Sequence, residues 1–228
     1  MLKQRLEQVR ERIRRAAESC GRDAGSVRLV AVSKTVAADT VREAIEAGVT
    51  ILGENYVQEA RDKFKALVQY PVSWHFIGHL QSNKAKYAVR LFDLIHSVDS
   101  LKLARELDKQ AAKVDKVQHI LVQVNISGED TKSGISADEA PGLIAEIGRL
   151  KNIAVKGLMT MPPYFYQPEK VRPFFAALRE LRDRIKEHTP PNVSLDELSM
   201  GMTGDFEVAI KEGATLVRIG TAIFGERQ

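Results

Sequence analysis

The feature that most constrains this sequence of 228 residues is a regular alternation of short apolar runs with helix-forming segments. Eight runs have the length and the apolar composition of buried β-strands. Most of their first residues lie about 20 to 25 positions apart, the length of one strand and one helix. The predicted strands are Arg28–Ser33, Thr50–Gly53, Ser73–Gly78, Leu91–His96, Val117–Asn125, Ala154–Met159, Ser194–Ser199 and Thr215–Ile219.

Amphipathic segments fill the intervals between these runs. An N-terminal helix is predicted to end at Gly21, because apolar residues recur before it at helical spacing, at Leu2, Leu6, Val9, Ile13 and Ala16. Ser136 and Glu139 form a capping-box pattern ahead of a later helix. The remaining predicted helices are Thr40–Ala47, Leu101–Lys113, Leu143–Leu150, Val171–His188 and Phe206–Glu212.

Eight strand–helix units favour a closed parallel barrel. We expect an α/β protein with a single (β/α)8 TIM barrel over residues 1–228, which begins with the N-terminal helix. The main alternative is an open doubly wound sheet, which usually carries a glycine-rich turn after its first strand. That turn is Ser33–Ala38 here, and it contains no glycine. The proline-bearing segment Met161–Pro168 is interpreted as a loop over one rim of the barrel.

The composition is that of a soluble globular protein, with 44% hydrophobic and 28% charged residues. The single cysteine, Cys20, allows no intrachain disulfide, which is typical of a reducing compartment. The N-terminal residues lack an apolar signal core, and no apolar run is long enough to span a bilayer. We therefore expect a cytoplasmic protein without a membrane contact. The 34 basic residues are interleaved with 30 acidic ones and no nucleic-acid motif accompanies them, so nucleic acid is not an expected partner.

Lys34 ends the first predicted strand, directly after the apolar run Leu29–Val32 and Ser33. A lysine at the end of a buried strand is placed at the mouth of a pocket. Partial desolvation there weakens the preference for the charged form, and a neutral amine can attack a carbonyl carbon to form a Schiff base. The alternative is a lysine that only ends a strand and reaches water. Position alone favours that alternative.

Two glycine-bearing segments follow the seventh and eighth strands, at Ser199–Gly204 and Gly220–Gly225. Each leads toward a predicted helix or helical turn, so backbone N–H groups can approach an anion near a partial positive charge. Barrels of this class often bind phosphate between the ends of strands seven and eight. The alternative is that these glycines serve only tight turns. Two such segments at neighbouring strand ends favour a phosphate site.

A Schiff-base lysine and a phosphate site on one barrel rim point together to pyridoxal 5′-phosphate. The sequence resembles the pyridoxal-phosphate homeostasis protein family over nearly its whole length. The resemblance implies a barrel like the N-terminal domain of alanine racemase, a cofactor held as a Schiff base on Lys34, and a role in intracellular storage and delivery of that cofactor. The segments that carry it are Ala31–Thr35, Gly53–Glu59, Trp74–Lys84, Leu198–Met202 and Val217–Gly225.

The resemblance also assigns individual residues to the cofactor site. Arg218 matches an arginine that faces the pyridine nitrogen and keeps it unprotonated, which makes the ring a weaker electron sink. Lys132 stands where racemases have an arginine near the phenolic oxygen. Met159 is expected to line the pocket. The remaining assignments are Asn55 near the ring, and Ser199, Met200, Gly220 and Thr221 around the phosphate.

Two functional classes remain open, and no catalytic residue is assigned. The first is a non-enzymatic carrier, expected to be monomeric and to supply apo-forms of pyridoxal-phosphate enzymes. The second is a pyridoxal-phosphate-dependent amino-acid racemase, which needs an acid or base group on each face of the substrate carbon. In alanine racemases one such group is a tyrosine from a further domain, which we expect this chain to lack because it stops at Gln228. A Schiff-base aldolase would use Lys34 and a phosphate site but does not account for Arg218.

No metal site is expected from the histidines. His75 and His79 lie four positions apart, but the strand-like pattern of Trp74–Ile77 argues against a helical metal pair. No cysteine or carboxylate cluster joins them. His96 and His119 lie in or beside apolar strands and are interpreted as structural.

Overall fold

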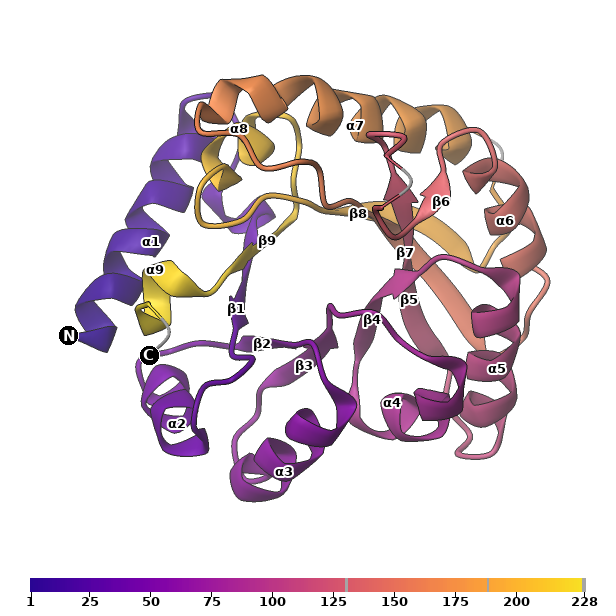
Figure 1. Cartoon of the computed structure of the whole chain (residues 1–228), viewed down its shortest axis with the longest axis horizontal. Coiled ribbons are helices and arrows are strands. Elements are labelled where there is room, and N and C mark those ends of the chain that lie inside the picture. The colour runs from indigo at the N-terminus through magenta and orange to yellow at the C-terminus, as the bar shows by residue number, and fades with distance from the viewer. Residues whose placement is uncertain (130, 188, 227–228) are drawn as a thin grey trace.

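The described part of the chain, residues 1–129, 131–187 and 189–226 of this computed structural model, forms a parallel β-barrel surrounded by helices (Figure 1). Neighbouring barrel strands pair in the order β4-β3-β2-β1-β9-β8-β7-β5, and pairing of β4 with β5 closes the ring. The short strand β6 (Ile135–Ser136) adds to β5. The eight barrel strands of these ranges are β1 (Arg28–Val32), β2 (Ile51–Glu54), β3 (Ser73–Phe76), β4 (Leu94–Val98), β5 (Gln118–Asn125), β7 (Ile153–Met159), β8 (Val193–Ser199) and β9 (Leu216–Ile219).

Helices cover the outside of the barrel and alternate with its strands along the chain. Helix α1 packs beside α8 and α9, next to the last strand (Figure 1). In the described part of the chain, none of the helices combines the length and apolar character needed to cross a membrane. The helices are α1 (Leu2–Glu18), α2 (Ala38–Glu46), α3 (Val57–Leu67), α4 (Ala85–Leu91), α5 (Leu101–Ala112), α6 (Ala140–Ile147), α7 (Arg172–Lys186), α8 (Phe206–Lys211) and α9 (Thr221–Phe224), with 3-10 turns η1 (Ala24–Ser26), η2 (Ser82–Lys84) and η3 (Pro168–Val171).

The predicted TIM barrel is confirmed, and the differences concern the ends of elements. Strand β4 begins at Leu94 and not at Leu91, because α4 runs to Leu91. Helix α6 begins at Ala140, three residues before the predicted start, with a proline in its first turn, where the missing N–H costs nothing. The predicted helix over 171–188 is a 3-10 turn followed by α7. Its predicted end, His188, lies outside the described residues, as do Asp130 and Gln228.

Two apolar clusters fill the interior. The larger one lies between the barrel and its helices and includes the fully buried rings of Phe76, Phe92, Phe175 and Phe206. The smaller one takes one side chain from each of six strands, so it fills the inside of the barrel. We call this second cluster the apolar plug. It consists of Val30, Ile51, Leu94, Leu121, Met159 and Leu216.

Candidate functional site

A pocket of about 770 Å³ opens at the carboxyl ends of the barrel strands. Five of the nine residues predicted for the cofactor site lie on its wall: Lys34, Asn55, Arg218, Gly220 and Thr221. Cavities of roughly 300–1,000 Å³ with a few converging polar groups are typical of small-molecule sites. The structure thus brings together residues that lie 21 to 187 positions apart from Lys34 in the sequence.

Strand geometry explains why these side chains share the pocket. Successive side chains on a strand point to opposite faces, so every second residue faces the barrel interior. Lys34 lies four positions beyond the plug residue Val30 on β1, and Arg218 lies two positions beyond the plug residue Leu216 on β9. Asn55 lies four positions beyond Ile51 of β2. The apolar plug therefore closes the bottom of the barrel, and the polar residues of the same faces line the space above it.

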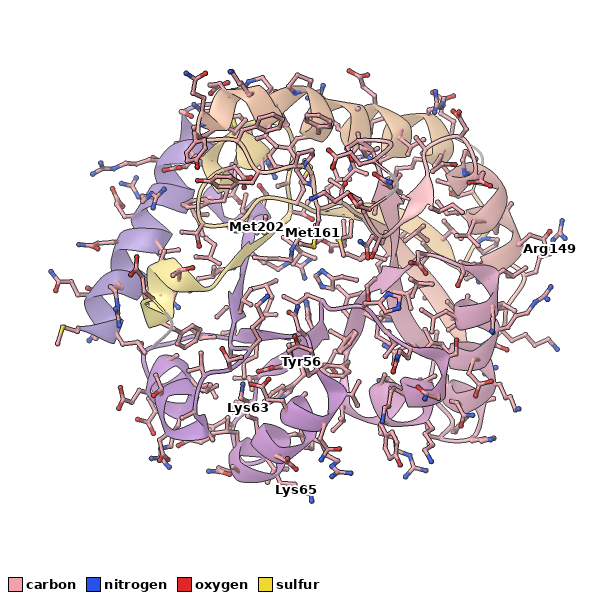
Figure 2. All side chains as sticks on the ribbon, in the orientation of Figure 1. Tyr56, Lys63, Lys65, Arg149, Met161 and Met202 are labelled. Carbon is pink, nitrogen blue, oxygen red and sulfur yellow. The ribbon has the colours of Figure 1, made fainter. Side chains whose placement is uncertain are left out.

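The outer part of the pocket is formed by loops with apolar side chains. Met161, Tyr164 and Phe165 come from the loop after β7, which was predicted to lie over one rim. Met202 comes from the segment after β8. Met161 and Met202, both labelled in Figure 2, belong to this pocket wall. Met161 and Tyr164 are exposed, so they form the outer rim of the pocket.

A carboxylate–lysine cluster of Glu54, Glu59 and Lys63 lies beside the strand end that carries Lys34. The Nζ of Lys63 donates to Glu54 Oε1 at 2.8 Å, to Glu59 Oε1 at 2.6 Å, and to the carbonyl oxygen of Ser33. The hydroxyl of Ser33 donates to Glu54 Oε1 at 2.6 Å. Lys63 is only 6% exposed and Glu54 is fully buried. Burial raises the pKa of the Glu54 carboxyl, although Lys63 and Ser33 oppose this.

The backbone directly after Lys34 is strained. Thr35 has φ 62°, in the left-handed region that β-branched residues rarely adopt. Such a conformation costs about 1–3 kcal/mol and persists only when surrounding contacts hold it. The N–H of Thr35 donates to Glu59 Oε1 at 2.5 Å, so the carboxylate–lysine cluster supplies one of those contacts. Strain of this kind concentrates at binding sites.

Strand β9, the neighbour of β1, carries Arg218, which heads a buried chain of hydrogen bonds that we call the arginine network. Its Nη1 donates to Ser199 Oγ at 2.6 Å, and its Nη2 donates to the carbonyl oxygen of Thr160 at 3.0 Å. Nδ1 of His96 is 2.8 Å from the same Ser199 oxygen, and Nε2 of His96 is 3.0 Å from Nδ1 of His75. The network crosses the barrel interior from β9 to β3.

The charges of this network are unevenly distributed. Burial lowers the pKa of Arg218 to about 10, while the negative charge of Asp205 opposes the shift, so the guanidinium stays protonated at neutral pH. Burial lowers the pKa of His75 to about 4 and that of His96 well below its ordinary value. Both rings are therefore neutral at pH 7. One buried cation faces the pocket, supported by neutral dipoles.

Several groups of the pocket wall can accept a ligand without rearrangement. The Oδ1 atom of Asn55 is buried and has no hydrogen-bond partner among the described residues. Gly204 has open space where a Cβ would stand, and a Cβ on Gly220 would lie 3.3 Å from the carbonyl oxygen of Val32. Gly201 serves packing instead, because its φ is +90° and a Cβ would lie 2.6 Å from Cβ of Ala209.

Four predicted site residues lie away from the described pocket wall. Ser199 and Met200 are fully buried, with Ser199 behind Arg218 in the arginine network. Met159 belongs to the apolar plug at the bottom of the barrel. Lys132 lies in the loop after β5, where its N–H donates to the carbonyl oxygen of Glu129 at 3.0 Å. Lys132 and Met159 therefore do not belong to the described pocket wall that carries Lys34 and Arg218.

The sequence analysis assigned no role to the carboxylate–lysine cluster or to the two linked histidines. Glu59 and Lys63 carried a usable signal, because opposite charges four apart on a helix form a pair. His75 and His96 were treated separately, and only the fold brings them together. His79, in contrast, is exposed while His75 is buried. In the ranges that the structure describes, there is no group of three or more His, Cys, Asp or Glu residues that could hold a metal ion.

The fold and the pocket are those of a racemase-type barrel with a lysine at the end of its first strand. The sequence matches the family "Alanine racemase, N-terminal domain" over residues 4–228. It is 48% identical over 225 residues to the "Pyridoxal phosphate homeostasis protein" of Aquifex aeolicus (strain VF5), covering 99% of this chain and 98% of that protein. The chain belongs to the pyridoxal phosphate homeostasis protein family.

Solved structures agree with this assignment. PipY of Synechococcus elongatus PCC7942, whose structure was solved with PLP bound, matches with a TM-score of 0.86 and 35% identity over 99% of this chain and 100% of that one. An alanine racemase of Clostridium difficile 630 matches with a TM-score of 0.74 at 16% identity, over 99% of this chain and 56% of that one. The second likeness shows a shared barrel fold.

Proposed function

We propose that this protein binds pyridoxal 5′-phosphate as a Schiff base on Lys34 and acts in the cytoplasm as a non-catalytic, monomeric carrier that supplies apo-enzymes. The observation that carries the proposal is the convergence of Lys34, Asn55, Arg218 and Thr221 on one pocket. The proposal is supported by family membership and by the relative PipY, which was solved with PLP bound.

The residues of the pocket fit such a cofactor. Asn55 offers a buried oxygen that needs a partner, and Gly204 leaves open space at the backbone for a phosphate to approach. Thr221 adds a hydroxyl beside Gly220 on the same wall. The bound cofactor would supply an aldehyde that reacts with an amine, and Lys34 would supply that amine.

Arg218 favours a carrier over a catalyst. We assign this protonated guanidinium to the pyridine nitrogen, as the family resemblance implies. A guanidinium donates a hydrogen bond but does not readily give up its proton, so the ring nitrogen stays neutral and withdraws electrons weakly. The buried supports of Arg218, at Ser199 and Thr160, hold it in that role.

The comparison of chain lengths also favours a carrier. This chain matches 98% of its Aquifex relative, which is named for homeostasis, but only 56% of the Clostridium alanine racemase. The racemase therefore carries a large part outside the shared barrel. A racemase needs an acid or base group on both faces of the substrate carbon, and the barrel provides Lys34 on one face.

Cofactor transfer and α-proton exchange together test the proposal. The loaded protein should reactivate an apo-form of a pyridoxal-phosphate enzyme. With each common L-amino acid in deuterated water, it should exchange the α-proton no faster than free cofactor does. Turnover near 1 s⁻¹ or above, the lower end of ordinary enzymes, would establish the racemase alternative. Lys34→Ala should lose the violet absorbance of the Schiff base, whereas Lys132→Ala should keep it.

A further inference from the structure

One pair of side chains on α3 holds the two peptide groups that flank Lys34. The Nζ of Lys63 donates to the carbonyl oxygen of Ser33, in the peptide group before Lys34. Glu59 Oε1 accepts the N–H of Thr35, in the peptide group after Lys34. Glu59 and Lys63 lie four positions apart on α3 and contact each other at 2.6 Å. The two contacts therefore act as one unit.

This pair lies behind the barrel wall and not in the pocket. Lys34 belongs to the described pocket wall, whereas Glu54, Glu59 and Lys63 do not. Figure 2 shows Lys63 on the barrel side of α3 and Lys65 on its outer side, where Lys65 is exposed. The hydrogen bonds that the pair makes at Lys34 are therefore bonds to the backbone on both sides of this residue.

We propose that Glu59 and Lys63 are positioning residues that hold the backbone at Lys34 so that its amine reaches an aldehyde carbon in the pocket; this inference rests on the proposed function. In the reaction the lone pair of the neutral Nζ forms the C–N bond, and the aldehyde oxygen leaves as water with the two amine protons. A misplacement of about 1 Å can slow a reaction roughly 100-fold. The left-handed Thr35 makes such a misplacement easy when its support is lost.

Glu59→Ala tests the proposal, because Glu59 is partly exposed and its loss leaves the buried Glu54–Lys63 pair intact. Two quantities are measured on the cofactor-free protein: the rate of Schiff-base absorbance with saturating pyridoxal 5′-phosphate, and the affinity for pyridoxine 5′-phosphate, an alcohol that cannot form the bond. We expect the rate to fall about 10- to 100-fold, with the affinity unchanged. Glu59→Gln keeps an oxygen for the Thr35 N–H and should restore most of the rate.

The contradicting results are distinct. An unchanged rate in Glu59→Ala, or a loss of rate matched by an equal loss of affinity for the alcohol, overturns the positioning role. A wild-type protein that forms no covalent bond at all overturns the proposed function instead.

Lys63→Met and Lys65→Met form a matched pair on the same helix. We expect Lys63→Met to slow bond formation and Lys65→Met to leave it unchanged. A folded Lys63→Met protein with the wild-type rate overturns the proposal. Thermal melting identifies a Lys63→Met protein that fails to fold, in which case the two Glu59 variants decide.

Discussion

Two neighbouring regions of the barrel stabilise buried cations in different ways. Beside β1 and β2, behind the pocket wall, Lys63 is paired with two carboxylates, Glu54 and Glu59. On the side of β8 and β9, Arg218 is held by neutral acceptors, the hydroxyl of Ser199 and the carbonyl oxygen of Thr160. The first arrangement places two carboxylates on one lysine, and the second gives Arg218 neutral hydrogen-bond partners on a pocket wall that also carries Asp205.

The two regions therefore contribute differently, one to the backbone geometry at Lys34 and the other to the attraction of a ligand. The carboxylate–lysine cluster lies outside the pocket wall, and its hydrogen bonds fix the backbone next to Lys34. A buried cation supported by dipoles costs desolvation energy that a ligand of complementary charge or lone pairs can offset. Under the proposed function, the β1–β2 region would present the reactive amine, and the β8–β9 region would anchor the molecule with which that amine reacts.

The largest change in stability is expected from Gly201→Ala, in the segment that follows β8. A Cβ there would lie 2.6 Å from Cβ of Ala209 and 2.9 Å from Cα of Phe206, at a φ of +90°. Strain and overpacking together should lower the free energy of unfolding by about 2–5 kcal/mol. Gly204→Ala, in the same segment but with open space, should change it by less than about 0.5 kcal/mol. Equal urea midpoints for the two variants would contradict the packing role of Gly201.

The next effect concerns acid and the neutral histidines of the arginine network. The pKa of His75 is about 4 in the folded protein, against 6.5 ordinarily. Between these values the unfolded chain binds more protons, so the free energy of unfolding falls as pH drops from 6.5 to 4. The loss from this residue is on the order of 3 kcal/mol.

Urea unfolding at pH 7.5, 5.5 and 4.5 measures that loss. His75→Gln should show a smaller decline on acidification than the wild-type protein. His79→Gln, which changes an exposed histidine, should decline as the wild-type protein does. If the free energy of unfolding of His75→Gln fell on acidification as much as that of the wild-type protein, the arginine network would tolerate a second positive charge at His75.

The smallest effect should distinguish a direct anchor from a supporting residue. Thr221 lies on the pocket wall, so Thr221→Ala should weaken binding of pyridoxal 5′-phosphate by about 1.5–3 kcal/mol, with no effect on unphosphorylated pyridoxal. Ser199 lies behind Arg218, so Ser199→Ala should instead lower the free energy of unfolding by about 1–3 kcal/mol, because Arg218 loses an acceptor. Calorimetric binding to both ligands, with urea unfolding, checks both. If Ser199→Ala instead weakened binding of pyridoxal 5′-phosphate and left the free energy of unfolding unchanged, Ser199 would lie at the phosphate.

The barrel was predictable because its signal is local. Apolar runs and amphipathic segments alternate along the chain, several helices are followed closely by glycine, and the order of units fixes the topology. The boundary at β4 was not predictable, because apolar residues stand on both sides of it, Leu91 and Phe92 at the end of α4 and Leu94 and Ile95 in β4. Periodicity cannot tell a buried helix end from a buried strand start.

The sequence predicted the site residues that lie at strand ends. It did not predict how deep a side chain lies in the barrel or which distant residues contact each other. Lys34 lies just beyond β1, Arg218 lies near the carboxyl end of β9, and both line the pocket. Met159 faces the barrel interior as expected, yet it lies at the level of the plug, and alternation along a strand gives the face but not the depth. His96 and Ser199 are 103 positions apart, so only the closed barrel reveals their contact.

Borohydride trapping followed by peptide mapping tests the central claim most directly. Borohydride reduces a Schiff base to a stable amine, so the cofactor mass stays on the residue that held it. The protein incubated with pyridoxal 5′-phosphate and reduced should carry one cofactor mass, located on Lys34, and Lys34→Ala should carry none. A cofactor mass on Lys132 or another lysine, or no trapped mass in the wild-type protein, would contradict the assignment of the reactive amine to the β1–β2 side of the pocket.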